Sequence, residues 1–193
     1  MANDKELAAG LGTAFRGSAA RANYVSADKC DAQFAFKDVC RFISKPTSQA
    51  WMALKRICCF YNGSPRLIYC FPLQRAESVD VYTDTDWAGC PRTRKSTSGG
   101  AVMFGAHTVQ HWSSTQASTA LSSGEAEFYG VVRVSGQGLG YQALFLDLGV
   151  EVPLRVWTDS SAAIGICSRQ GIRNSGTSTL RRSGYSRPFA RGA

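Results

Sequence analysis

The chain has 193 residues, enough for one ordinary domain and a small appendage, and 44% of them are apolar, which allows a hydrophobic core. It contains no run of eighteen or more apolar residues and no apolar segment near its start, so we expect neither a membrane span nor a secretory signal. The net charge is +8, but residues 1–159 hold sixteen basic and fourteen acidic residues, and six later arginines carry the excess. The net charge alone therefore does not indicate that residues 1–159 bind nucleic acid.

The seven cysteines are scattered, and no C-x-x-C pair occurs among them. This spacing does not predict a zinc site. A set of reduced thiols is typical of proteins inside the cell. We therefore expect an intracellular protein, cytoplasmic or nuclear and not secreted.

The first third of the chain predicts a small helical hairpin. Residues 1–14 give weak signals and are expected to be loose. Apolar residues at helical spacing predict a helix within 28–44 and a second one over 46–61, which ends at Asn62 and Gly63. The short apolar run at 66–71 predicts a strand.

The rest of the chain alternates between strand and helix patterns. Residues 78–84, 99–106, 107–114 and 153–159 are predicted strands, and 121–149 and 160–169 are predicted helices. Ser122 and Glu125 fit a capping box at the start of the long helix. The order β-β-β-α-β-α predicts an α/β fold with a mixed sheet and helices packed against it.

Three carboxylates stand at the ends of these elements. Asp84 ends the first strand, Glu127 lies in the first turns of the long helix, and Asp159 ends the fourth strand. If those strands are neighbours, the three groups lie close together and repel each other, and a divalent cation such as Mg²⁺ would relieve the repulsion. The same residue types are also ordinary choices for helix capping and the helix dipole, so spacing alone leaves both interpretations open.

Three stretches carry a family resemblance: "YTDTDWAGCPRTRKSTSG", "VQHWSSTQASTALSSGEAEF" and "VWTDSSAAI". Over residues 78–171 they resemble the ribonuclease H domain of copia-type retrotransposon polyproteins. Residues 15–71 resemble the thumb-like C-terminal end of the reverse transcriptase in the same polyprotein. No Y-x-D-D polymerase signature is present, so DNA synthesis by this chain is not expected.

The resemblance implies a ribonuclease H-like mixed sheet, incomplete here, and a two-metal hydrolysis of the RNA strand in RNA–DNA hybrids. It implies that Asp84, Glu127 and Asp159 are catalytic and bind Mg²⁺ or Mn²⁺. It implies nucleic-acid contacts from five residues, namely Arg94, Lys95, Ser96, Thr97 and Ser123. The implied partners are the hybrid and the rest of a reverse transcriptase polyprotein, with no membrane involved.

The resemblance stops after Gly171. Residues 172–193 are rich in arginine and free of acids, and we expect them to be a disordered tail. The family's fifth strand, last helix and fourth acid are then missing, so the domain at 78–171 is truncated and cleavage is expected to be impaired. The alternative is a non-catalytic relic or a module that binds a hybrid or another nucleic acid.

Overall fold

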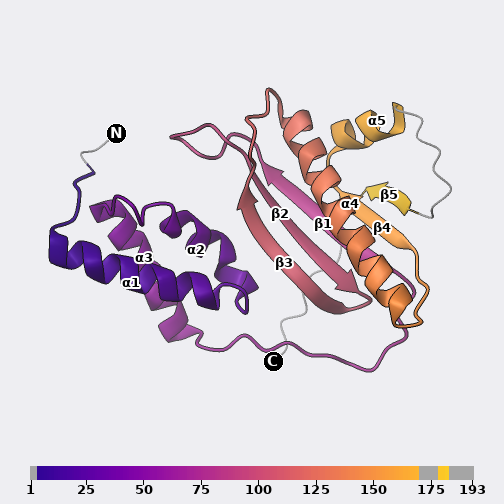
Figure 1. Ribbon diagram of the computed structural model, residues 1–193, viewed down its shortest axis with the longest axis horizontal. Coiled ribbons are helices and arrows are strands. Elements are labelled where there is room, and N and C mark those ends of the chain that lie inside the picture. The colour runs from indigo at the N-terminus through magenta and orange to yellow at the C-terminus, as the bar shows by residue number, and fades with distance from the viewer. Residues whose placement is uncertain (1–3, 170–177, 183–193) are drawn as a thin grey trace. The chain divides into compact units, whose positions relative to one another are not determined.

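The computed structural model describes residues 4–169 and 178–182, in which the chain forms two compact units. The first unit runs to Phe71 and includes His111–Ser114, and the second contains the remaining described residues. Five α-helices, one short 3₁₀ helix and five strands lie within this part of the chain (Figure 1). None of its helices is long and apolar enough to cross a bilayer.

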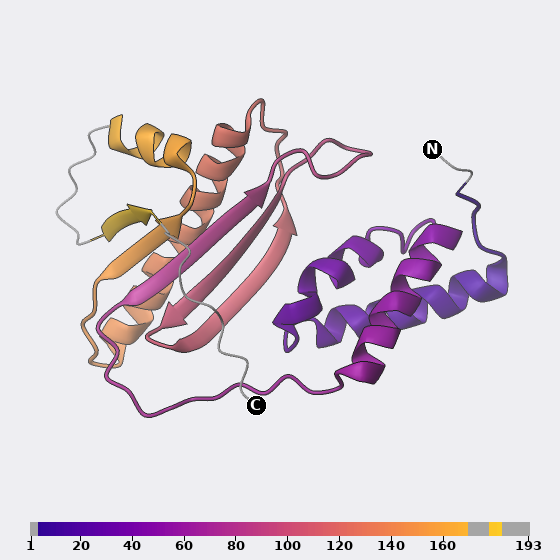
Figure 2. The same cartoon turned by 180° about the vertical axis from the view of Figure 1, so that it is seen from behind.

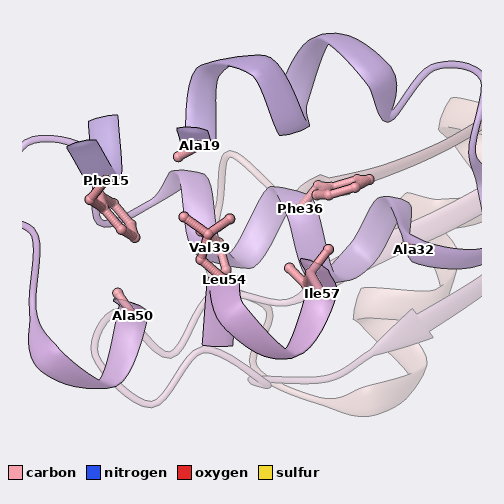
Figure 3. Packing of buried hydrophobic residues seen from close by; sticks show 8 residues of the cluster. All are labelled: Phe15, Ala19, Ala32, Phe36, Val39, Ala50, Leu54 and Ile57. Carbon is pink, nitrogen blue, oxygen red and sulfur yellow. The ribbon is translucent and has the colours of Figure 1, made fainter. Parts of the chain in front are cut away.

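The first unit is helical and has its own core. It contains α1 (Ala9–Val25), a 3₁₀ turn (Cys30–Ala32), α2 (Gln33–Cys40) and α3 (Ser48–Gly63). The side chain of Thr47 caps α3 by accepting a hydrogen bond from the Ala50 amide at 3.3 Å. Figure 3 shows the buried cluster between the helices, which consists of Phe15, Ala19, Ala32, Phe36, Val39, Ala50, Leu54 and Ile57.

Two predictions for this region are wrong. The segment expected to be loose, 1–14, is helical from Ala9 onward, because burial of Phe15 and Ala19 stabilises a helix whose sequence pattern is weak. The expected hairpin is therefore part of a three-helix unit. Residues 66–71 form no strand, since no second strand pairs with them there.

The second unit is built on a mixed sheet. Its elements are β1 (Val79–Asp86), β2 (Thr97–Phe104), β3 (His107–Thr115), α4 (Ser123–Asp147), β4 (Leu154–Thr158), α5 (Ser161–Arg169) and β5 (Ser178–Arg182), except that the part of β3 from His111 to Ser114 belongs to the first unit. The strand order is β3-β2-β1-β4-β5, with β1 antiparallel to β2 and parallel to β4. The predicted α/β class and the order β-β-β-α-β-α are confirmed up to α5.

The fifth strand was not expected. Residues 178–182 lie in the segment predicted to be disordered, yet they form β5 parallel to β4, so that prediction is wrong at these positions. Pairing with the edge of β4 uses backbone groups and needs no apolar pattern in the added strand. The other residues of 172–193 lie outside the described part of the chain.

Helix α4 lies across one face of the sheet, as Figures 1 and 2 show from opposite sides. The predicted capping box is present, because the Ser122 hydroxyl accepts a hydrogen bond from the Glu125 amide at 3.2 Å. Val131 and Val134 of α4 are buried in the same core as the strands. The strand residues of this core are Val79, Val81, Val102, Leu154 and Val156.

Gly138 lies in tight contact with the sheet. A Cβ atom there would lie 2.6 Å from Leu154 Cδ1 and 3.0 Å from Val81 Cγ1. We expect Gly138→Val to lower the free energy of unfolding by about 2–3 kcal/mol through overpacking. Urea denaturation of the purified protein measures this. The matched control is Gly140→Val, two residues along the same helix, where a Cβ meets nothing within 4 Å. Equal losses in both variants would contradict the packing argument.

Candidate metal site

The three predicted carboxylates come together at one end of the sheet. One oxygen from each of Asp84, Glu127 and Asp159 lies within 4.8 Å of the other two. Asp84 lies in β1, and Asp159 directly follows β4. In the parallel register Tyr82 is level with Trp157, so two residues further along Asp84 is level with Asp159. Glu127, in the first turns of α4, reaches them from the helix that covers the sheet.

The acidity of Glu127 is strongly perturbed by its surroundings. Burial, followed by the negative charges of Asp84 and Asp159, raises the pKa of Glu127 to about 7 from 4.5. A hydrogen bond with the Thr85 backbone opposes part of this rise. Its Oε2 atom is buried and has no hydrogen-bond partner among the described residues. The fold therefore holds a carboxylate oxygen in an unsatisfied position beside two other acids.

This arrangement fits a divalent cation. Carboxylate oxygens are hard ligands of the kind that Mg²⁺ and Mn²⁺ prefer. Oxygens on opposite sides of a Mg²⁺ ion are separated by about 4.2 Å, so a triad within 4.8 Å needs only small side-chain adjustments. The unpaired Oε2 of Glu127 would gain the partner that it lacks. The triad can thus act as a cation site that is open to solvent, since Asp84 and Asp159 are exposed.

The two acids next to the triad have other contacts. Glu125 accepts hydrogen bonds from the Leu121 amide at 2.7 Å and the Tyr129 hydroxyl at 2.8 Å. These bonds, with the Leu121 amide first, lower the pKa of Glu125. Asp86 is exposed, and its carboxylate lies over the backbone of Gly89. Glu125 therefore serves the helix start, and neither residue belongs to the triad.

The hydroxyl residues expected to contact nucleic acid lie mostly inside the protein. Ser96 and Thr97 are buried. The Ser96 hydroxyl accepts a hydrogen bond from the Ala88 amide at 3.1 Å, and Ala88 has a left-handed backbone with φ of 53°. Ser96 therefore holds the loop after β1 in shape. Ser123 is exposed at the first turn of α4.

The two basic residues of that set differ from each other. Lys95 donates a hydrogen bond from Nζ to the Ala117 carbonyl at 2.6 Å, which ties two loops together. Arg94 is exposed, with φ of 55°. Contact between these residues and nucleic acid stays a prediction, and Arg94 and Ser123 have the side chains that are most open to solvent.

Sequence reasoning missed a polar cluster between β1 and β4 that is centred on Asp80. Asp80 of β1 accepts two hydrogen bonds from Arg155, at 2.6 Å from both Nε and Nη2, and one from Trp157 Nε1 at 2.7 Å. The Ser78 hydroxyl donates a fourth at 2.8 Å. Because Arg155 and Trp157 both belong to β4, these bonds fix the β1–β4 register that sets Asp84 level with Asp159. A charged residue inside a strand was the signal available in the sequence.

Comparison with curated proteins finds distant similarity to retrotransposon Pol polyproteins over most of the chain. The retrovirus-related Pol polyproteins from transposons RE2 and RE1 of Arabidopsis thaliana are each 28% identical over 158 residues, which is 81% of this chain and 11% of the relative. The Pol polyprotein from transposon TNT 1-94 of Nicotiana tabacum is 29% identical over 133 residues, 66% of this chain and 10% of its own. The chain spans about a tenth of the length of these relatives. No family model and no solved structure gives a significant match.

Proposed function

We propose that the second unit is a ribonuclease H-like module of a retrotransposon Pol polyprotein and that it hydrolyses the RNA strand of RNA–DNA hybrids. The observation that carries the proposal is the triad of Asp84, Glu127 and Asp159, three carboxylates from separate elements within 4.8 Å. The sheet order β3-β2-β1-β4-β5 and the similarity to Pol polyproteins support it.

Each triad residue has a distinct part in this proposal. Asp84 and Asp159 are exposed, so their carboxylates face the side from which a phosphodiester would approach. Glu127 must lose its proton before both of its oxygens can act as ligands, and its pKa of about 7 makes the site more competent as the pH rises through neutrality. When bound at these carboxylates, Mg²⁺ or Mn²⁺ supplies Lewis-acid stabilisation of phosphate and an acidified water.

In this proposal the residues around the triad contact the sugar-phosphate backbone of the nucleic acid and not its bases. Arg94 would add a positive charge for phosphate, and Ser123 stands at a helix N-terminus, where backbone amides favour anions. Recognition of the hybrid would then depend on groove shape and 2′-hydroxyl groups rather than on base sequence. The rest of a Pol polyprotein is the proposed covalent partner of the unit.

The experiment is cleavage of a labelled RNA–DNA hybrid in Mg²⁺ or Mn²⁺. We expect Asp84→Asn and Asp159→Asn each to reduce the cleavage rate by about 100-fold or more, because each removes a charged ligand. Asp86→Asn is the matched control, since it removes an exposed acid of the same strand that lies outside the triad. Cleavage that survives both triad changes, or that Asp86→Asn removes equally, would contradict the proposal.

A second candidate is a module that binds the hybrid without cutting it. The number of metal ligands favours this binding module. The triad offers three carboxylates, whereas a site that holds two metal ions needs more ligands than a site that holds one. Under this alternative the purified protein binds the hybrid, and Mg²⁺ stabilises the triad, but no RNA is cleaved. The same assay, with hybrid binding measured alongside, separates the two candidates.

A further inference from the structure

Helix α4 carries a second apolar stripe on the side away from the sheet. Its buried residues face the strands, whereas five residues at alternating spacings of four and three lie on the opposite side: Val132, Gly136, Leu139, Ala143 and Leu146. All five are exposed. The outward face of a helix that packs on a sheet is normally polar, so the exposed aliphatic side chains of Val132, Leu139 and Leu146 indicate a contact surface.

A surface pocket lies on the stripe. A pocket of about 270 Å³ is lined by Leu139, Gln142, Ala143 and Leu146 of α4, with Glu151 and Val152 beside them. The four helical residues stand at i, i+3, i+4 and i+7, which is the set that receives one side chain in coiled-coil packing. The pocket is smaller than the roughly 300–1,000 Å³ of small-molecule sites, so an aliphatic side chain from another helix suits it better.

The stripe is complementary to itself in the antiparallel sense. Large and small residues alternate along it, and a two-fold axis level with Tyr141 sets Leu139 of one copy against Ala143 of the other. The same axis sets Leu146 against Gly136, where a Cβ atom would meet nothing within 4 Å and a helix can approach closely. Each large side chain then meets a small one, as a symmetric interface requires.

The charges beside the stripe favour the same arrangement. Arg133 and Asp147 each directly follow a large stripe residue, and both are exposed. In the antiparallel pairing Arg133 of one copy faces Asp147 of the other, and this contact occurs twice. A parallel pairing would instead set Leu139 against Leu139 and Gly136 against Gly136, so that large side chains would meet large ones and small residues small ones. Asp147 also stands at the C-terminal end of α4, where a facing cation is favourable.

We propose that the outward stripe of α4 is the interface of an antiparallel homodimer, in which Leu139 of each copy enters the pocket of the other. The occupant is a second copy of this chain, because both the size pattern and the charge pattern are self-complementary. The proposal is independent of the proposed nuclease function, since none of the triad residues lies in the stripe.

The test is the molar mass of the full chain in solution by sedimentation equilibrium. The wild type is expected to have twice its chain mass of 20.8 kDa at tens of micromolar. Leu139→Glu should raise the dimer dissociation constant by at least 100-fold. Leu144→Glu is the matched control, because Leu144 is 50% exposed against 53% for Leu139 on the same helix but lies off the stripe, and it should leave the dimer intact.

Two further variants separate loss of the interface from loss of folding. Gly136→Leu should give a monomer whose helix is no less stable, since leucine favours helix more than glycine and meets open space there. Arg133→Asp should weaken the dimer about tenfold, and adding Asp147→Arg should restore it. A monomeric wild type, an equal effect of Leu139→Glu and Leu144→Glu, or a failure of the charge exchange to restore association would overturn the proposal.

Discussion

Glu127→Gln is expected to raise the free energy of unfolding at pH 8 by about 2 kcal/mol when no divalent cation is present. The pKa of Glu127 is about 7 in the folded chain against 4.5 for an ordinary glutamate, because of burial and the charges of Asp84 and Asp159. The full shift corresponds to about 3 kcal/mol, and contact with water reduces this figure. The amide removes the repulsion while it keeps the shape of the side chain.

The sign of this effect gives a pH profile. Between pH 4.5 and about 7 the folded chain binds a proton at Glu127 that the unfolded chain has released. The contribution of this group to the stability of the wild type is therefore greatest at low pH and falls as the pH rises through 7. The free energy of unfolding of Glu127→Gln should therefore exceed that of the wild type at pH 8 and equal it at pH 4, as measured by urea denaturation in EDTA.

Two controls sharpen the experiment on Glu127. Glu125→Gln, two residues away on the same helix, should destabilise the chain instead, because hydrogen bonds from the Leu121 amide and Tyr129 lower the pKa of Glu125. Millimolar Mg²⁺ should raise the melting temperature of the wild type more at pH 8 than at pH 6, and that of Glu127→Gln little at either pH. A wild type that Mg²⁺ leaves unchanged at pH 8 would show that the triad is not a cation site.

Arg155→Met is expected to lower the free energy of unfolding by about 3 kcal/mol at pH 7, because it leaves the buried carboxylate of Asp80 without its cation. The expected loss lies at the low end of the range for buried pairs, because 34% of the Arg155 side chain is exposed and water can partly replace it. Burial alone would raise the pKa of Asp80, but the hydrogen bonds from Arg155, Trp157 and Ser78 outweigh burial and hold it below its usual value.

The loss in Arg155→Met should depend on pH in the sense opposite to that at Glu127. A carboxyl whose pKa is lowered on folding stabilises the fold above its unfolded pKa of 3.8, and this contribution is lost as the pH falls. The difference between Arg155→Met and the wild type should therefore be full at pH 7 and shrink as the pH falls into the acid range, where Asp80 is protonated first in Arg155→Met and then in the wild type. Arg155→Lys keeps a charge but loses the two-pronged contact, so it should recover only part of the stability. A constant difference from pH 7 to pH 3 would exclude the ion pair as its cause.

The sequence allowed the triad and most of the second unit to be predicted. Asp84, Glu127 and Asp159 lie at element ends whose apolar patterns are strong, so their meeting follows from the order of strands and helices. The cluster around Asp80 could not be predicted in the same way. Its partner Arg155 is 75 residues away in the chain, and the pairing depends on the β1–β4 register, which is known only from the structure.

The errors at the two ends of the chain have a common physical cause. Helix α1 and strand β5 both have weak local signals, and each is formed by contacts with distant residues. Phe15 and Ala19 of α1 gain their burial from helices that follow, and β5 gains its backbone bonds from β4. The run at 66–71 shows the reverse, because a good local strand pattern without a paired neighbour forms no strand.

The two units have separate hydrophobic cores, and this affects how the chain unfolds when it is heated in a calorimeter. The apolar cluster around Leu54 and Phe36 belongs to the helical unit, and the one around Val81 and Leu154 belongs to the sheet. A chain with two cores has two potential cooperative units, so its heat absorption need not follow one van't Hoff transition. Unfolding of the sheet should then be followed by a local probe, such as the near-UV signal of the stacked Tyr82 and Trp157 rings, rather than by total helix content.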